Sequence, residues 1–227
     1  SNELGLRGNP AAAEEIMVAR EIALCRLTRS PVHIAHISTQ IALEHVRRAK
    51  DAGLPVTAEA SPHHLTLNEE HVRGYDTNFK MAPPLRAQSD VEALRKAVAE
   101  GLVDVIATDH APHGEVDKAV EFDQAANGIL GLQTAVPLTL KLVEDGIVSL
   151  ARWVESLTTA PAKLLKLPYG TLRVGQAADV TIIRNQKEWT LTEEMIASKS
   201  HNSPFLNWKF NSQVACTIVG GKVVFEQ

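Results

Sequence analysis

The feature that most constrains this chain is a repeated unit in which a short apolar run, a polar stretch and a helical pattern follow one another. The apolar runs contain several β-branched residues and lie at 32–37, 56–60 and 103–108. Strands of this kind, alternating with helices of ten or more residues, predict parallel pairing with helices packed outside the sheet. The chain is therefore expected to be α/β, built either as a barrel or as a doubly wound sheet.

Helix start signals flank the apolar runs. Asn9 as an N-cap, with Pro10 at the first helical position, predicts the start of one helix. Ser38 or Thr39 is expected to cap a second helix, and Ser89 opens a third as part of a capping box. Later helical patterns cover 132–144, 150–157 and 161–167.

The pattern changes after about residue 168. Apolar runs at 179–183 and 214–219 predict strands, and Gly220-Gly221 predicts a two-residue hairpin turn into a further strand. We therefore divide the chain into a helix–strand domain, 1–168, and a small β domain, 169–227, that carries a polar loop.

Composition excludes several classes of protein. The 227 residues are 44% hydrophobic and 22% charged, which is typical of a globular protein and not of a disordered one. A net charge of −4 and an aromatic content of 4% argue against a nucleic-acid partner. No apolar run approaches the roughly 18 residues that a membrane span needs. The lone cysteines Cys25 and Cys216 are expected to be unpaired core residues, in keeping with a cytoplasmic location.

Chemistry-bearing residues gather where the three apolar runs end. In parallel α/β folds the carboxyl ends of the strands meet at one edge, and active sites are built there. Histidine and aspartate are common ligands of catalytic metals, so this clustering indicates a hydrolytic metal site. The residues concerned are His33, His36, His63, His64, Asp109, His110 and His113.

Strand geometry narrows this set. Residues three apart on a strand point to opposite faces, so His36 is preferred as a ligand and His33 is expected in the core or against a helix. Asp109 directly ends the third run. His63 and His64 have two open readings, as metal ligands or as turn histidines bonded to the backbone. One His and one Asp are too few for a catalytic zinc, which takes three protein ligands, so spacing alone leaves the metal site undecided.

Five segments carry a more specific pattern. They read H-I-A-H-I-S-T at 33–39, V-T-A-E-A-S-P-H-H-L at 56–65, K-M-A-P-P-L-R at 80–86, A-T-D-H-A-P-H at 107–113 and S-K-S-H-N-S-P-F at 198–205. In this order they resemble the dihydroorotases of the longer bacterial type, which belong to the amidohydrolase superfamily. The resemblance covers essentially the whole chain.

The resemblance implies a fold. Members of this family combine a distorted (β/α)8 TIM barrel with a small β-sandwich assembled from both chain ends. By this match the chain supplies the C-terminal part of the barrel, with three of its eight strands, and part of the sandwich. The family's early H-x-H pair, a bridging carboxylate and a further metal histidine have no counterpart here. We therefore expect this chain by itself to be inactive.

The resemblance also implies an activity, the reversible cyclisation of N-carbamoyl-L-aspartate to L-dihydroorotate in pyrimidine biosynthesis. Two zinc ions are expected. His36 would ligate one, while Asp109 would ligate the other and move a proton between the hydroxide and the ring nitrogen. His113 would contact the carboxylate of this small-molecule substrate. The backbone at Asn127 and Gly128 would hold its ring.

One residue departs from the family pattern and leaves other activities open. Many members have Asn at the position of Ala82, where the side chain contacts the substrate. The first alternative is a related cyclic amidohydrolase, of the hydantoinase or allantoinase type. The second is a dihydroorotase-like subunit without activity that partners aspartate transcarbamoylase. A homodimer is the assembly that the resemblance implies.

Overall fold

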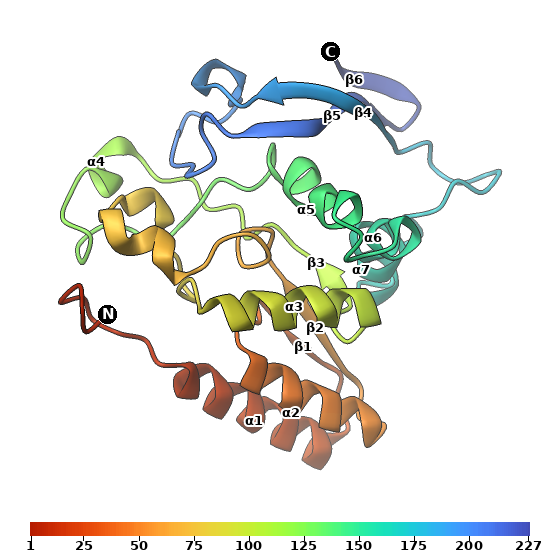
Figure 1. The fold of residues 1–227 in the computed structure, drawn as a ribbon. Coiled ribbons are helices and arrows are strands. Elements are labelled where there is room, and N and C mark those ends of the chain that lie inside the picture. Colours follow the sequence, from red (N-terminus) through yellow and green to blue (C-terminus); the bar gives the residue numbers. More distant parts are fainter.

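Two separate sheets organise the computed structural model, which describes residues 1–185 and 188–227 in full (Figure 1). The first sheet is parallel, has the order β1-β2-β3, and consists of β1 (Val32–Ile34), β2 (Val56–Ala60) and β3 (Val105–Ile106). The second is antiparallel, has the order β4-β5-β6, and consists of β4 (Val180–Thr190), β5 (Lys209–Val219) and β6 (Lys222–Glu226). The predicted α/β class is confirmed.

Helices alternate with the parallel strands. The α1 helix packs against α2, α2 packs against α3, and α3 packs against α6 (Figure 1). Within the described residues, the α-helices are α1 (Ala11–Thr28), α2 (Gln40–Asp51), α3 (Gln88–Glu100), α4 (Glu115–Lys118), α5 (Ala135–Glu144), α6 (Leu150–Leu157) and α7 (Thr159–Leu164). Single 3₁₀ turns lie at η1 (Glu69–Gly74), η2 (Thr77–Phe79) and η3 (Glu193–Met195). No helix among the described residues is both long enough and apolar enough to cross a membrane.

The helix starts agree only in part with the predicted caps. Thr39 caps α2, because its side chain accepts from the backbone N–H of Ala42 at 3.3 Å. The expected caps Asn9 and Ser89 are wrong, since the N-cap positions of α1 and α3 hold Pro10 and Ala87 without a side-chain cap. In α3 the first turn is used for a contact with α2, in which the Asp90 carboxylate accepts from the N–H of Gln40 at 2.8 Å. A local pattern does not encode such a contact.

Two clusters of buried side chains form the core. The first lies between the parallel strands and their helices, with Val46, Ala58 and Val103 fully buried. The second lies beneath the antiparallel sheet and joins Leu67, Ile129 and Phe205 from three distant segments. Both cysteines are free, as predicted, but only Cys25 lies in the buried core, whereas Cys216 on β5 is half-buried.

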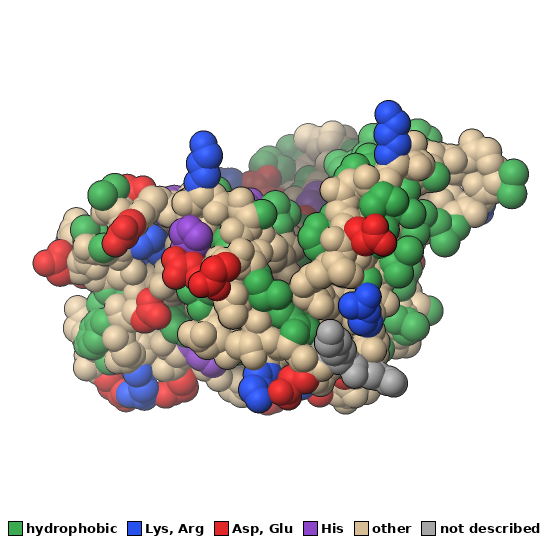
Figure 2. All heavy atoms as spheres, turned by 90° about the horizontal axis from the view of Figure 1, so that it is seen from above, with side chains coloured by type: hydrophobic (Ala, Val, Ile, Leu, Met, Phe, Trp, Pro, Cys, Tyr) green, Lys and Arg blue, Asp and Glu red, His purple; other side chains and the backbone are tan. Residues whose placement is uncertain are grey.

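The antiparallel sheet is longer and more exposed than the pattern predicted. Both β4 and β5 run for 11 residues, because polar residues that broke the apolar pattern still pair across the two strands. Gly220 and Gly221 form the turn into β6 with φ of 56° and 77°, as predicted. Figure 2 looks onto this side of the molecule and shows hydrophobic side chains among the polar ones. The exposed apolar residues of this sheet include Ile182, Val219, Val223, Val224 and Phe225. The boundary at 168/169 stays a prediction.

Candidate active site

Side chains from the carboxyl ends of all three parallel strands converge at one place. His36 follows β1, Glu59 lies on β2, and Asp109 follows β3. The Nδ1 atom of His36 lies 3.0 Å from Oε1 of Glu59, and its Nε2 atom lies 3.6 Å from Oδ1 of Asp109. Although the two candidate ligands are 73 positions apart in the printed sequence, the fold brings their polar atoms together.

The backbone turns sharply at both ligand candidates. His36 has a φ of 51° and Asp109 a φ of 48°, so both lie in the left-handed region that costs a non-glycine residue about 1–2 kcal/mol. The strands have already ended, at Ile34 and Ile106. Such strain is concentrated at functional sites, where the surrounding structure holds it in place. Here the turns carry the two residues whose polar atoms face each other.

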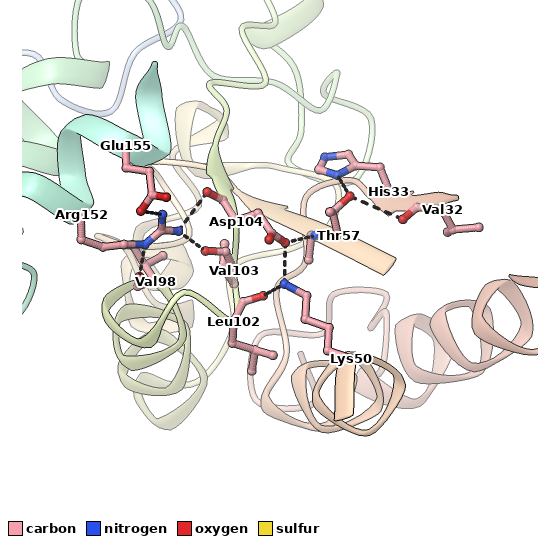
Figure 3. Close-up of polar contacts among 11 residues, drawn as sticks. Val32, His33, Lys50, Thr57, Val98, Leu102, Val103, Asp104, Arg152 and Glu155 are labelled. Atoms are coloured by element: carbon pink, nitrogen blue, oxygen red, sulfur yellow. Dashed lines mark hydrogen bonds and ion pairs between the residues drawn. The ribbon is translucent and has the colours of Figure 1, made fainter. Parts of the chain in front are cut away.

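The position of His33 differs from the prediction. Its Nε2 atom contacts Oε2 of Glu59 at 3.0 Å, so His33 and His36 touch the same carboxylate. Its Nδ1 atom contacts the Thr57 hydroxyl at 2.8 Å (Figure 3). Thr57 lies two residues before Glu59 on β2, so both side chains point to the same face of the sheet. The expectation of opposite faces fails because β1 ends at Ile34, so strand alternation does not extend to residue 36.

This cluster perturbs the charges of its members. Partial burial pushes the pKa of Glu59 upward, but the contacts with His33 and His36 outweigh burial and lower that pKa to about 2. The contact with Glu59 raises the pKa of His36 above its ordinary value; burial opposes this rise and the Asp109 charge adds to it. Glu59 is therefore an anion that faces two imidazoles.

His36 and Asp109 were tested as donors for the metal that the sequence suggested. An imidazole nitrogen and a carboxylate oxygen are ordinary zinc ligands. The Nε2 atom of His36 and Oδ1 of Asp109 lie 3.6 Å apart, so ions held by the two residues would be close neighbours. In addition, the buried Nδ1 atom of His36 has no aligned hydrogen-bond partner among the described residues, despite its short distance to Glu59. The donor types fit zinc.

The number of donors is smaller than a complete site needs. Within the described part of the chain, no three His, Cys, Asp or Glu side chains are placed to hold one metal ion together. His36 and Asp109 are therefore two possible donors, fewer than the three protein ligands that a catalytic zinc takes.

The loop residues expected to bind substrate are packed against each other. The Nε2 atom of His113 contacts the carbonyl oxygen of Asn127 at 2.8 Å. Gly128 donates its N–H to the carbonyl of Lys80 at 2.9 Å. A Cβ atom added at Gly128 would lie 2.6 Å from the His113 ring and 2.8 Å from the Ala111 side chain. Glycine is thus required at 128 because of this close approach.

Two cavities divide the candidate residues. Ala82 and Asn127 line a cavity of about 760 Å³, together with most of the first eleven residues and with Glu69, Glu70, Val72 and Arg73. His36 lines a separate cavity of about 230 Å³ beside α1. Two of the expected substrate contacts and one expected metal ligand therefore open onto different hollows of this chain.

His63 and His64 behave as turn histidines. Both are 2% exposed, and the Ser61 hydroxyl lies 2.8 Å from Nε2 of His63 and 2.7 Å from Nδ1 of His64. The Nε2 atom of His64 contacts the carbonyl oxygen of Pro83 at 3.0 Å. Burial lowers the pKa of His64 to about 4 and that of His63 well below its usual value. Of the two open readings, the structure supports the second.

A buried network fixes the chain directly after His36. The Glu14 carboxylate of α1 accepts from the N–H groups of Ser38 and Thr39, at 2.9 and 3.0 Å. Arg86, only 8% exposed, donates to the Ser38 hydroxyl at 3.0 Å and to the Asn9 carbonyl at 2.6 Å. This network couples α1 and the start of α2 to the candidate site.

Two residues of the site were missed by the sequence reasoning. Glu59 had a detectable signal, because it is a charged residue inside an apolar strand and shares a face with Thr57. Asn202 lies in the motif at 198–205, and it bridges the loops after β3 by three side-chain hydrogen bonds. Spacing alone gives no hint of that bridge.

Known proteins resemble the chain in sequence. Residues 11–224 match the pattern described as the Amidohydrolase family. The dihydroorotase of Geobacter sp. (strain M21) is 52% identical over 226 residues, which is 100% of this chain and 53% of that protein. The dihydroorotase of Trichlorobacter lovleyi is 49% identical over 225 residues, which is 99% of this chain and 53% of that protein. The chain spans about half the length of the curated relatives that it matches.

Solved structures resemble the chain in fold. An L-hydantoinase (dihydropyrimidinase) from Arthrobacter aurescens has a TM-score of 0.92 at 29% identity, over 96% of this chain and 50% of that one. A D-hydantoinase (dihydropyrimidinase) from Thermus sp. has a TM-score of 0.87 at 26% identity, over 96% of this chain and 49% of that one.

Proposed function

Because the chain belongs to the amidohydrolase family, we propose that it forms part of a zinc-dependent dihydroorotase. The reaction is the reversible cyclisation of N-carbamoyl-L-aspartate to L-dihydroorotate in pyrimidine biosynthesis. Identities of about 50% to curated dihydroorotases over the whole of this chain support the proposal. The observation that carries it is the approach of His36 to Asp109, at 3.6 Å, on two strained turns at the carboxyl ends of parallel strands.

The fold proposal is more specific than the α/β class. We propose that β1, β2 and β3 are three strands of a distorted (β/α)8 barrel and that β4–β6 belong to its small β-sandwich. Parallel pairing, helices between the strands and active-site residues at the carboxyl ends support the barrel. The high TM-score to a hydantoinase gives further support.

His36 and Asp109 are proposed to ligate two zinc ions, as two members of a larger ligand set. Bound zinc would polarise the amide carbonyl and lower the pKa of the attacking water. In hydrolysis, Asp109 accepts the proton of that water and passes it to the ring nitrogen as the C–N bond breaks. In cyclisation the same carboxylate takes the proton from the nitrogen. Glu59 faces the other nitrogen of His36 and can hold its ring in place.

The remaining candidates are proposed to bind the substrate. The Nε2 atom of His113 donates to the Asn127 carbonyl, so its Nδ1 can donate to the substrate carboxylate when the ring is an imidazolium. The backbone at Asn127 and Gly128 would hold the ring. Ala82 lines the cavity that Asn127 also lines, so a water would replace the amide found there in many family members.

The test is hydrolysis of L-dihydroorotate by the full-length protein, with zinc content measured on the same sample. Asp109→Asn and His36→Ala should both lose activity, and His36→Ala should also lose zinc. Retained activity in Asp109→Asn would contradict its role as the proton carrier. Full zinc content in His36→Ala would contradict its role as a ligand.

A second candidate function is another cyclic amidohydrolase, of the hydantoinase or allantoinase type. The hydantoinases among the similar structures and the presence of Ala82 favour it. A panel of dihydroorotate, hydantoin, dihydrouracil and allantoin separates the two, because the favoured substrate should have the highest kcat/KM.

We also propose an assembly and a location. The resemblance supports a homodimer in the cytoplasm, and the two free cysteines agree with a reducing compartment. An inactive partner of aspartate transcarbamoylase is the remaining alternative. Co-purification with a transcarbamoylase, without zinc or hydrolysis, would favour it.

A further inference from the structure

One buried side chain ties together the loops that are expected to hold the substrate. Asn202 lies between η3 and β5, and its Nδ2 atom donates to the carbonyl oxygens of Ala111 at 2.9 Å and Gly128 at 3.1 Å. Its Oδ1 atom accepts from the backbone N–H of His113 at 3.1 Å. The residue is 4% exposed, so both ends of its amide are paired inside the protein.

The two loops also contact each other around this amide. Ala111 donates its N–H to the Ile129 carbonyl at 3.1 Å, and the His113 ring contacts the Asn127 carbonyl at 2.8 Å. The backbone carbonyl of Asn202 accepts from the N–H of Leu130 at 3.1 Å. The loop after β3 and the 127–130 segment therefore share one hydrogen-bonded unit with Asn202 at its centre.

Core packing fixes the position of Asn202. Phe205, three residues later, is 1% exposed and belongs to the second buried cluster. Its ring meets that of Trp208 edge-on, with 5.1 Å between centroids, and its N–H donates to the Ser203 hydroxyl at 3.3 Å. The motif thus has two functions: Phe205 anchors the segment, and Asn202 faces the loops.

We propose that Asn202 is a positioning residue for substrate binding, which holds His113 and Gly128 at the spacing that the substrate's carboxylate and ring require. The inference rests on the proposed function, because it takes these residues as substrate contacts. Asn202 acts through the loops and does not touch the reacting atoms. Since Gly128 lies against the His113 ring, a shift of either loop displaces the other.

The amide is the group that this position requires. It offers two N–H donors for two carbonyls and an oxygen acceptor for one N–H. Aspartate has the same shape but would place an oxygen against the carbonyls of Ala111 and Gly128. Alanine leaves all three backbone groups without their partner.

The experiment compares Asn202→Asp and Asn202→Ala with the wild type in the zinc-loaded, full-length protein. The KM for L-dihydroorotate should rise about 10- to 100-fold, because misplaced loops weaken binding. The kcat value and the zinc bound per chain should stay within about threefold of wild type. A variant that merely folds less well would lose kcat and zinc together and keep its KM, which would overturn the proposal.

The matched control is Asn211→Ala, which removes an exposed asparagine from β5 and should leave KM unchanged. A second measurement does not depend on activity. Amide hydrogen exchange at 109–113 and 126–131 should accelerate in both Asn202 variants. Unchanged exchange would show that Asn202 does not hold the two loops together. If the wild type does not hydrolyse dihydroorotate, the proposed function fails, while the exchange result still decides whether Asn202 holds the loops.

Discussion

The two ends of the parallel sheet use charged residues in opposite ways. At the amino end, Asp104 accepts from the ammonium of Lys50 at 2.7 Å and from the N–H of Ala58 at 2.8 Å (Figure 3). Lys50 also donates to the carbonyl of Leu102 at 2.8 Å. Each charged group there has an aligned hydrogen-bond partner. The network joins α2, β2 and the start of β3.

Arg152 of α6 completes the amino end. Its guanidinium donates to the carbonyls of Val98, Val103 and Asp104 at 2.9, 2.6 and 2.9 Å. It also pairs with Glu155 at 2.8 Å, as Figure 3 shows. A charged donor with several acceptors of this kind is a strong stabilising contact.

The carboxyl end is less completely paired. His36 and Asp109 have strained backbones, and the buried Nδ1 atom of His36 has no aligned hydrogen-bond partner among the described residues. The two ends of the parallel sheet therefore have different roles. The amino end stabilises the fold, and the carboxyl end keeps polar atoms available for a ligand. Four experiments test this separation.

The largest effect is expected for Asp109→Asn. Removing a carboxylate that carries the proton should lower kcat for dihydroorotate hydrolysis by about 1,000-fold or more. The free energy of unfolding should not fall, because the one polar contact of this side chain in the described part of the chain is with His36, at 3.6 Å. Steady-state kinetics and urea unfolding of the full-length protein check both statements. A variant that unfolds easily would show that the carboxyl end also carries stability.

The second effect is a loss of stability in acid. The folded-state pKa of His64 is about 4, below the ordinary 6.5, so the unfolded chain binds the proton more readily. The stabilisation is therefore fully present above pH 6.5 and is lost as pH falls toward 4, by about 3 kcal/mol in total. Urea unfolding between pH 8 and pH 4.5 measures it. His64→Gln should remove its share of this pH dependence and leave the share of the buried His63, whereas the exposed control His201→Gln should leave the curve unchanged.

The third effect concerns the amino end. Arg152→Met keeps the apolar stem but leaves three carbonyl groups without their donor, which should lower the free energy of unfolding by about 2–3 kcal/mol. The kcat and KM of the remaining folded protein should match wild type. A changed KM in fully folded Arg152→Met would show that the amino end of the sheet also affects substrate binding. Lys163→Met, on the neighbouring helix α7, serves as the control.

The smallest effect is expected for Gly101→Ala. Gly101 ends α3 with a φ of 76°, a conformation that costs alanine about 1 kcal/mol. A Cβ there would meet only the Arg152 side chain, at 4.0 Å, so no clash adds to this cost. Chemical unfolding should show a loss of about this size with unchanged kinetics. A loss several times larger would mean that the amino-end network also shifts.

Much of the scaffold could be predicted from periodicity. The longer helices, the parallel pairing of the first three strands and the Gly220-Gly221 turn follow from local patterns of apolar residues and glycines. The lengths of the strands do not, because the chain leaves β1 after Ile34 to place His36 in a left-handed turn. That turn depends on contacts with other strands, which no local pattern encodes.

The candidate site was predictable in part. The position of His36 and Asp109 at the ends of apolar runs pointed to them, although the strand alternation that favoured His36 over His33 does not hold. Glu59 was missed because its role depends on two histidines of a neighbouring strand and its turn. Asn202 was missed because its partners lie in loops far away in the sequence, and only the folded chain brings them within hydrogen-bond distance.

The three hydrogen bonds of the Asn202 side chain have a consequence for how the protein is made. They join residues 91, 89 and 74 positions apart, whereas His33 and Thr57 of β1 and β2 meet across 24. Contacts that close long loops cost more chain entropy and form later than local ones. During synthesis the strands can pair while the C-terminal region is still inside the ribosome. The loops can be fastened only after residue 202 has emerged, so the hydrogen-bonded unit around Asn202 is completed late in folding.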